Sequence, residues 1–446
     1  MTMRWSAGLA CFALAAAAMH GQSRTVYFSG ARLIQGDGGA PLENGAFVVR
    51  DGRIAAIGPA ASVKAPPGAA RVDLTGRTVM PAMINVHAHL GYEGFTSWGA
   101  SNYTPETVLD HLQREAFYGI GATQSVGSTP AESSIQFQRD QQAGKFAAAS
   151  RFFFMPGMAP PNGGPDEILI KATAALHAVS EVSTAAEARA AVRGMAAKRL
   201  KSVKIWVDDR RGTYPKMPPE VYTAIIDEAH KNHMLVNAHA LTLADQKAVV
   251  RAGADVLIHI VQTEKVDDEM LALVAEKKPY WTPVMALGDR SDVCEKDPFF
   301  DQTLPAKVAA EIREKNCGSL SAAAANREQA LAYNFPRMIA AGARLVLGTD
   351  AGVLPRCSFG FSEHHEIARY VQLGLTPAQA IAAATQRPAE LLGIQDMGTL
   401  AVGKSADFLV LAANPLDDIR NTRTIAGVYL HGSALDRQAL LAKWRN

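Results

Sequence analysis

The sequence predicts an α/β protein, a (β/α)8 barrel joined to a small β-sandwich domain that is built from both chain ends. Three observations predict this fold class. Eight short apolar runs alternate with helical patterns over about 315 residues, as the strands of a parallel barrel do. Short strand-like runs that cannot bury themselves stand at both ends of the chain. The length of 446 residues exceeds one ordinary core and suits a barrel of about 250 residues plus a smaller module.

We place the TIM-barrel portion at residues 81–395. Helix start signals stand between its candidate strands: Thr184 with Glu187, and Thr376 with Gln379, have the spacing of capping boxes. No fixed-period repeat interrupts the alternation. The predicted strands are 80–86, 122–126, 152–155, 203–207, 234–237, 256–258, 280–283 and 344–347.

The β-sandwich domain is expected to combine residues 23–80 with residues 396–446. Asp51 and Gly52 stand between two apolar runs, and this pair is typical of a tight hairpin turn. Neither end has enough strands to bury a core alone, so we expect the two ends to form one small domain. The predicted strands are 26–28, 46–49, 54–57, 406–411 and 425–430.

The first 22 residues read as an export signal. Arg4 supplies a positive start, residues 5–19 are apolar, and polar sequence follows. About fifteen apolar residues are too few for a bilayer span, which needs about 20. We therefore expect cleavage between Ala18 and Ser23 and a soluble enzyme, periplasmic or secreted, with no membrane contact after the signal is removed.

Composition limits the partners that we expect. Hydrophobic residues make up 48% and charged residues 20%, which is typical of a globular protein. Lys and Arg number 45 and Asp and Glu 43, so the net charge is +2. This balance gives no electrostatic reason to expect nucleic acid or an acidic membrane. We expect a small-molecule substrate, and we leave a homo-oligomer open.

Three cysteines remain in the mature chain: Cys294, Cys317 and Cys357. In an oxidising compartment, Cys294 and Cys317 could close a loop within the polar stretch 288–319. The alternative is three buried thiols. None of the three has the spacing of a zinc cluster.

The first barrel strand ends in His87 and His89, and this pair is the strongest functional signal in the chain. Side chains two apart on a strand point to the same face, so the two imidazoles can hold one metal ion together. On its own, such a pair could also be two unrelated histidines in a loop. Polar residues near the ends of strands four, five, six and eight favour the metal site, because barrel chemistry gathers at the C-terminal rim. They are Lys204, His239, His259 and Asp350.

Each of these residue types suits a metal centre. Neutral imidazole and carboxylate are ligands for zinc and similar divalent ions. Lys204 as an ammonium would be repelled by cations, whereas carbamylation would make it an anion able to bridge two metals about 3.5–4 Å apart. The alternative for Lys204 is a structural lysine that pairs with Asp208 or Asp209.

Two further histidines, His364 and His365, shortly follow Asp350 and could reach the mouth of the site. We take both as candidates for substrate contact. Four others fit structural roles: His230 and His233 flank the end of the helix before strand five, where cations suit the helix dipole, and His111 and His177 lie in helical stretches.

Taken together, these motifs resemble the amidohydrolase superfamily, and more closely its imidazolonepropionase-like and prolidase-like metal-dependent hydrolases. The resemblance implies that His87, His89 and Asp350 bind a buried ion, that His239 and His259 bind a more exposed one, and that carbamylated Lys204 bridges the two. It implies two divalent metal ions, zinc being the expected metal, and Asp350 as general base. The motifs that carry it are 81–89, Lys204, His239, 253–259, 348–350, 373–377 and 403–411.

The chain departs from the pattern of the family at some positions. Ala82 and Asn85 stand where the family usually has Gly and Asp. After strand three, relatives often show Gly-Gly-His, whereas residues 162–165 here read Asn-Gly-Gly-Pro. Because that loop lacks the histidine, we expect it to shape a different substrate pocket.

These observations predict an amidohydrolase that cleaves an amide-type C–N bond, in a dipeptide or an N-acyl amino acid. A hydroxide held between the metals would attack the carbonyl carbon, and Asp350 would take the proton and deliver it to the leaving amine. One alternative is a deaminase or an enzyme that opens a lactam or lactone. Base deaminases of the superfamily commonly have Glu three residues after the fifth-strand histidine, and Thr242 stands there. The non-enzyme alternative is a metal-binding scaffold barrel.

Overall fold

The computed structural model describes residues 25–165, 167–287, 294, 297–317, 322–356 and 358–445. The expected export signal at residues 1–22 and the third cysteine, Cys357, lie outside them. Within the described part of the chain, no helix is both long enough and apolar enough to cross a membrane.

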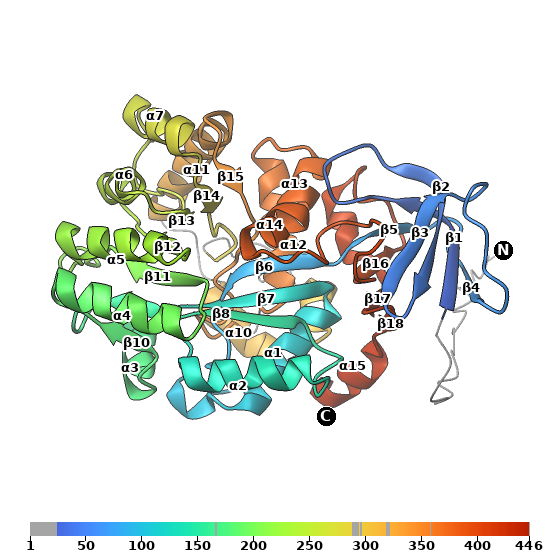
Figure 1. The fold of residues 1–446 in the computed structure, drawn as a ribbon, viewed down its shortest axis with the longest axis horizontal. Helices are drawn as coiled ribbons and strands as arrows, with labels where there is room; N and C mark the ends of the chain where they lie inside the picture. The colour runs from blue at the N-terminus through green and yellow to red at the C-terminus, as the bar shows by residue number, and fades with distance from the viewer. Residues whose placement is uncertain are drawn as a thin grey trace.

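The eight predicted barrel strands are all present and run parallel (Figure 1). Their bounds agree with the sequence prediction to within a few residues, because each is a buried apolar run. The strands are β6 (Met83–Ala88), β7 (Ile120–Val126), β8 (Arg151–Met155), β11 (Ser202–Trp206), β12 (Leu235–His239), β13 (Val256–Ile258), β14 (Tyr280–Thr282) and β15 (Arg344–Leu345).

The strands close on themselves through backbone hydrogen bonds. They pair as β6-β7-β8 and as β10-β9-β11-β12-β13-β14-β15, where β9 (Gly157–Ala159) directly follows β8 and β10 is Val179–Glu181. The chain after β15 joins β6, because Val86 N donates to Leu347 O at 2.9 Å. The chain after β8 joins β11, because Lys204 N donates to Pro156 O at 2.9 Å. The result is a barrel in which β6 and β15 are neighbours.

Helices surround the barrel, and both predicted capping boxes are confirmed. The Thr184 hydroxyl accepts from Glu187 N, and the Thr376 hydroxyl accepts from Gln379 N. The helices are α1 (Pro105–Phe117), α2 (Ala131–Gln142), α3 (Glu167–Ala175), α4 (Ala185–Ala197), α5 (Pro219–Lys231), α6 (Leu243–Ala252), α7 (Asp268–Lys277), α9 (Pro298–Asp301), α10 (Ala306–Asn316), α11 (Ala322–Ala340), α12 (Phe361–Gln372), α13 (Pro377–Ala384), α14 (Gln386–Leu392) and α15 (Arg437–Arg445), with 3-10 turns η1 (Ala100–Asn102) and η2 (Ile419–Arg423).

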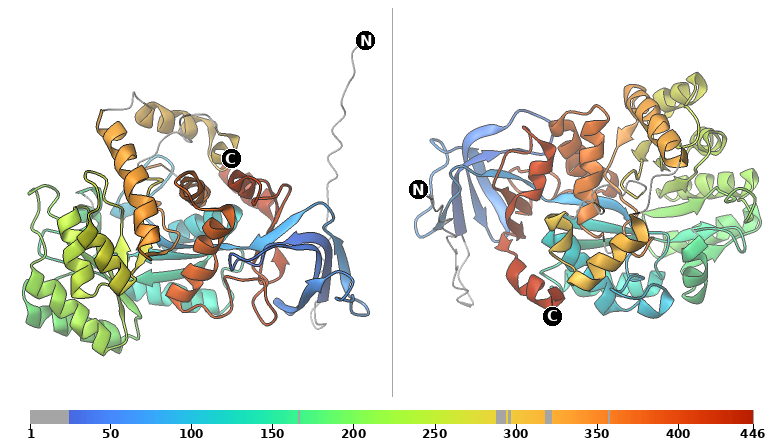
Figure 2. Two further views of the ribbon diagram at one scale, coloured as in Figure 1. Left: turned by 90° about the horizontal axis from the view of Figure 1, so that it is seen from above. Right: turned by 180° about the vertical axis from the view of Figure 1, so that it is seen from behind.

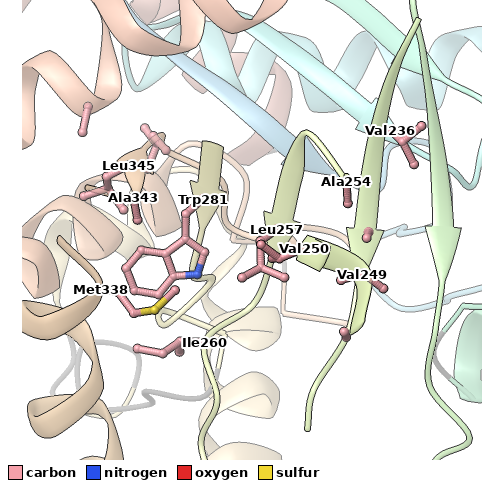
Figure 3. Close-up of a cluster of buried hydrophobic side chains, with 14 of the residues drawn as sticks. Val236, Val249, Val250, Ala254, Leu257, Ile260, Trp281, Met338, Ala343 and Leu345 are labelled. Atoms are coloured by element: carbon pink, nitrogen blue, oxygen red, sulfur yellow. The ribbon is translucent and has the colours of Figure 1, made fainter. Parts of the chain in front are cut away.

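The largest apolar cluster lies between the barrel strands and these helices. Figure 3 shows the indole of Trp281, from β14, beside Met338 and near Ile260. Trp281 is fully buried, and its Nε1 donates to His259 O at 2.9 Å. The core residue Trp281 therefore also fixes the backbone of a predicted metal ligand.

Both chain ends enter one mixed sheet beside the barrel (Figures 1 and 2). The predicted hairpin at Asp51 and Gly52 is present, with positive φ at both residues (51° and 77°). The pairings give a single sheet, so the union of the two ends is seen but a β-sandwich is not confirmed. The strands are β1 (Thr25–Leu33), β2 (Leu42–Arg50), β3 (Arg53–Pro59), β4 (Ala70–Asp73), β5 (Thr78–Pro81), β16 (Phe408–Leu411), β17 (Ile425–Leu430) and β18 (Ser433–Ala434).

This sheet supports the strand that carries His87 and His89. Strand β5 pairs with β16 from the other chain end and leads directly into β6. Ala82, between them, donates its N–H to Asp407 O at 3.0 Å. The start of the first barrel strand is thus anchored by the C-terminal part of the chain.

A disulfide joins Cys294 and Cys317, one of the two possibilities that the sequence left open, with 5.5 Å between the two Cα atoms. The alternative of three buried thiols is therefore wrong for this pair. The enclosed segment includes α9 and α10.

Candidate metal centre

The predicted ligands lie together at the C-terminal ends of the strands. His87 belongs to β6 and His89 follows it, His239 ends β12, His259 follows β13, and Asp350 follows β15. Each of these residues is at most 7% exposed, as is Lys204 in β11 at 1%. The barrel topology brings all six predicted ligand positions into one buried region.

The tightest cluster is formed by His87, His89 and Asp350, whose ligand atoms all lie within 4.8 Å of one another. Oδ1 of Asp350 lies 2.6 Å from Nε2 of His87 and 3.2 Å from Nε2 of His89. Nδ1 of His87 and Oδ2 of Asp350 are buried without a hydrogen-bond partner. Buried polar atoms are normally paired. A divalent ion held between the three side chains would be a partner for Oδ2 of Asp350, and imidazole and carboxylate are ligands that such ions prefer, so these residues fit a metal.

Backbone geometry at two of the ligands is unusual. Asp350 and His259 have φ values of 56° and 73°, a region that residues other than glycine rarely adopt and that is enriched at functional sites. Asp350 N donates to His87 O at 3.0 Å, which holds the two ligands together. The preceding Gly348 permits this approach, since a Cβ there would lie 2.7 Å from Cβ of His87.

Neighbouring groups orient the imidazole rings. Oγ of Ser128 lies 2.7 Å from Nδ1 of His89, which leaves Nε2 directed at Asp350. The carbonyl of His259 accepts from Nε2 of Gln246 at 3.2 Å, in addition to the bond from Trp281. The Ser128 contact is of the kind that fixes ring orientation in metal sites, whereas the two bonds to His259 hold its backbone.

His239 and His259 form the second part of the site. Nε2 of His259 lies 2.8 Å from Nδ1 of His239, and Nδ1 of His259 is 3.9 Å from Oδ2 of Asp350. The other ring nitrogen of His239 lies 2.8 Å from Nη1 of Arg210 and 3.1 Å from Oδ2 of Asp208. The sequence prediction did not include Arg210; its only signal was its place shortly after strand four.

Lys204 lies deep in the site, with Nζ 5.2 Å from the centre of the Trp206 ring. Of the two carboxylates proposed as its structural partners, Asp208 pairs with Arg210 and His239, and Asp209 lies 3.6 Å from Nζ of Lys216. Both carboxylates named as structural partners of Lys204 thus have other cationic partners, and the role of Lys204 stays a prediction.

The electrostatic environment prepares the ligands for a cation. Burial lowers the pKa of His87 to about 4, an effect opposed by Asp350 and strengthened by Lys204. Burial and nearby cations lower the pKa values of His239 and His259 well below the usual range. Burial alone would raise the pKa of Asp350, but His87 and hydrogen bonds from both histidines bring it well below its usual value. At neutral pH His87, His239 and His259 are therefore neutral and Asp350 is a carboxylate, as metal binding requires.

A buried carboxyl pair, Glu115 and Glu363, lies behind the first strand. Oε1 of Glu363 accepts from Nδ2 of Asn85 and, at 3.0 Å, from Oγ1 of Thr349, while Oδ1 of Asn85 accepts from His87 N at 2.9 Å. Burial raises the pKa of Glu363 to about 7 and that of Glu115 further above the usual range, with repulsion from Glu363 adding to it. Sequence reasoning missed both acids, because only the packing of α1 and α12 brings them together.

The two histidines expected at the mouth of the site lie on α12 and are buried. Nδ1 of His364 is 2.9 Å from Oγ1 of Thr422, and Nε2 is 2.8 Å from Tyr118 O. Both nitrogens of His364 are engaged within the scaffold, so this arrangement gives its predicted substrate contact no support. The contact of His365 stays a prediction.

Comparison with known proteins agrees with this geometry. The model of the amidohydrolase family matches residues 78–435, which is most of the chain and includes every predicted ligand. The chain belongs to the amidohydrolase family. It is therefore a hydrolase of that family, whose members typically depend on metal ions.

Similar proteins span nearly the same length. An ochratoxinase from Aspergillus niger is 24% identical over 89% of this chain and 82% of its own. An imidazolonepropionase from Symbiobacterium thermophilum is 25% identical over 84% and 85%. The crystal structure of a Xaa-Pro dipeptidase with bound methionine in the active site superimposes with a TM-score of 0.72, at 22% identity, over 92% of this chain and 99% of that one. The last likeness concerns the fold alone.

Proposed function

We propose that this amidohydrolase cleaves the amide C–N bond of a dipeptide or an N-acyl amino acid. The observation that carries the proposal is the buried cluster of His87, His89 and Asp350 at the rim of the barrel, in which burial lowers the pKa of His87 and the neighbouring histidines lower the pKa of Asp350. The structural likeness to a Xaa-Pro dipeptidase agrees with a substrate of this class.

The site would hold two divalent ions, with zinc the expected metal. His87, His89 and Asp350 would hold one ion, and His239 with His259 the other. When bound, such ions polarise a carbonyl oxygen and acidify a water molecule, which supplies the nucleophile for amide hydrolysis. Lys204 would join the two positions in its carbamylated form, because a buried ammonium beside four imidazoles and two cations is costly.

Asp350 is the residue that we assign to proton transfer. Its low pKa keeps the carboxylate ionised at neutral pH, so it can accept a proton from the attacking water. Its position between the two histidine pairs, 2.6 Å from His87 and 3.9 Å from His259, lies where that water would be held. From there it can deliver the proton to the leaving nitrogen.

The residue at position 242 favours hydrolysis over deamination. The Thr242 hydroxyl accepts from Asp245 N and so caps α6. It thus has a structural role in the place where a deaminase would have an acid. Under this proposal, the expected export signal places the reaction in the periplasm or outside the cell.

A screen of purified, zinc-loaded protein against dipeptides, N-acyl amino acids and lactams tests the proposal, with free amines and ammonia measured separately. Release of an amino acid without ammonia is expected. Ring opening alone, or ammonia alone, would contradict it. Release of an amino acid also decides against the scaffold alternative, whereas metal content alone does not, because a metal-binding scaffold would hold the metal as well.

A further inference from the structure

The barrel wall is interrupted where β8 and β11 meet. Among the described strands, β8 pairs only with β7, while β11 pairs with β12 and with β9, the short strand that follows β8. The pairing of β11 with β9 begins at Lys204, so the first residues of β11 share no ladder with β8. A pocket of about 230 Å³ lies at this place, lined by Phe153 and Met155 of β8 and by Ser202 of β11. We call it the seam pocket.

The seam pocket reaches the interior of the barrel. Its lining includes Gln124 of β7 and Asn237 of β12, the strands on the far sides of β8 and β11. Asn237 stands two positions before the predicted ligand His239 in the same strand, and side chains two apart share a face. Asn237 therefore points into the barrel, one layer below His239. The described lining residues include none of the predicted metal ligands, so this pocket is separate from the metal centre.

Two buried amides give the seam pocket a polar floor. Gln124 and Asn237 are 4% and 3% exposed, and Oε1 of Gln124 has no hydrogen-bond partner. Leaving such a buried atom unpaired is unfavourable. A side-chain amide offers both an acceptor and donors, and a half-turn of the group exchanges them. The floor therefore matches a ligand that carries both an N–H group and an oxygen acceptor.

The walls of the seam pocket are apolar and its charged residues are cationic. Phe153, Leu235 and Leu392 pack against a buried apolar cluster but are themselves only partly buried. Arg199 and Lys201, just before β11, are exposed lining residues. The described residues of the lining include no Asp or Glu. A ligand with an apolar body and one negative charge fits this combination.

We propose that the seam pocket is a second binding site, which takes an N-acylated amino acid or a similar small carboxylate with an N–H group. The N–H group and the acyl oxygen bind the amides of Gln124 and Asn237, and the apolar side chain lies against the walls. The carboxylate lies within the field of the two cations, whose long side chains can follow it.

The size of the seam pocket limits the ligand. Its volume is below the roughly 300–1,000 Å³ of sites for drug-sized molecules, so it suits one amino-acid derivative rather than a peptide. The inference does not depend on the proposed function, because it concerns binding without cleavage at residues outside the metal centre.

Calorimetric titration of the zinc-loaded protein with N-methanesulfonyl-leucine tests the inference. This probe has a carboxylate, an N–H group and oxygen acceptors, and its sulfonamide is not an amide that a hydrolase of this family would cleave. The comparison probe is 4-methylpentanoate, which keeps the apolar body and the charge but lacks the N–H group.

The variants separate the floor from the cations. Gln124→Met removes the buried amide at similar size, and the rim variant combines Arg199→Met with Lys201→Met. The matched control is Lys231→Met, which removes an exposed cation at the end of α5, outside the pocket. Melting temperature and metal content are measured for each variant.

The wild type should bind the sulfonamide with a Kd in the millimolar range or tighter, about 5- to 10-fold more tightly than 4-methylpentanoate, which is the usual worth of a buried hydrogen bond. Gln124→Met should remove most of this difference. The rim variant should weaken the binding of both probes by about 3- to 10-fold, as expected for two exposed ion pairs. Lys231→Met should bind both probes as the wild type does.

Two results would overturn the inference. One is a wild type without saturable binding of the sulfonamide up to about 10 mM, since water alone would then occupy the seam pocket. The other is binding that is unchanged in both Gln124→Met and the rim variant, which would assign the probe to another place such as the metal centre. If Gln124→Met does not fold, the rim variant decides, because it changes only exposed side chains. The assay measures no cleavage, so a failure of the proposed function leaves its result interpretable.

Discussion

Glu366 is predicted to make the stability of this protein depend on pH. It lies on α12 and is fully buried, and its carboxylate accepts from Met285 N at 2.8 Å and from Ala286 N at 2.5 Å. These bonds hold the chain after β14, where Val284 has an unusual φ of 55°. Burial raises the pKa of Glu366 to about 7, although the two backbone hydrogen bonds oppose the rise.

The size of the effect follows from the two pKa values. The usual value is 4.5 and the folded value about 7, and each factor of ten in proton affinity is worth about 1.4 kcal/mol, so the difference is about 3 kcal/mol. Because the folded pKa is the higher one, the folded state binds the proton more tightly. This stabilisation is fully present below about pH 4.5 and is lost as the pH rises through about 7.

Urea unfolding of the wild type and of Glu366→Gln between pH 4.5 and 8 measures the effect. Glutamine stays neutral, so the variant should gain stability relative to the wild type by up to about 3 kcal/mol across this range. Glu276→Gln, on the exposed end of α7, is the control and should run parallel to the wild type. A difference between wild type and Glu366→Gln that is constant with pH would refute the reasoning.

Three further predictions concern the site and the chain start. Lys204→Ala should lower metal content and activity together, and acetate should restore part of both; full activity with two metals would leave the bridging role without support. Asp350→Asn should lower turnover by a factor on the order of 10²–10⁴, with substrate affinity much less affected. Near-normal turnover with metals retained would show that Asp350 is not the general base. Mass spectrometry of the exported protein should find a chain that lacks about 18 to 23 residues, and an intact Met1 would contradict the export signal.

The barrel strands and their polar ends were predictable because they depend on local pattern. A strand of a parallel barrel is buried on both faces, so its sequence is a short apolar run. The barrel topology then brings the C-terminal ends of all strands to the same rim. His87, His239 and Asp350 could be placed together on this reasoning alone. The sheet from both chain ends followed in the same way, since neither end could bury its strands.

Features that depend on backbone twist or helix rotation could not be read from the sequence. Arg210 and Arg211 both have a left-handed backbone, yet only Arg210 reaches His239, while Arg211 is exposed. His364 follows Asp350 closely in sequence, but the rotation of α12 points it at Thr422. Glu115 and Glu363 are far apart in the chain and meet only through packing.

Asn85 stands where the family usually has Asp. The buried network of hydrogen bonds behind His87 gives this difference a physical explanation. The Asn85 amide donates to Glu363 and, at 3.1 Å, to Thr349, while its oxygen accepts from His87 N. An aspartate at this position could accept the bond from His87, but it would put a third carboxyl beside Glu363 and Glu115 in a fully buried space. Asparagine supplies the donor that Glu363 needs without adding charge. The substitution and the buried acids therefore complement each other, and the support of His87 is retained.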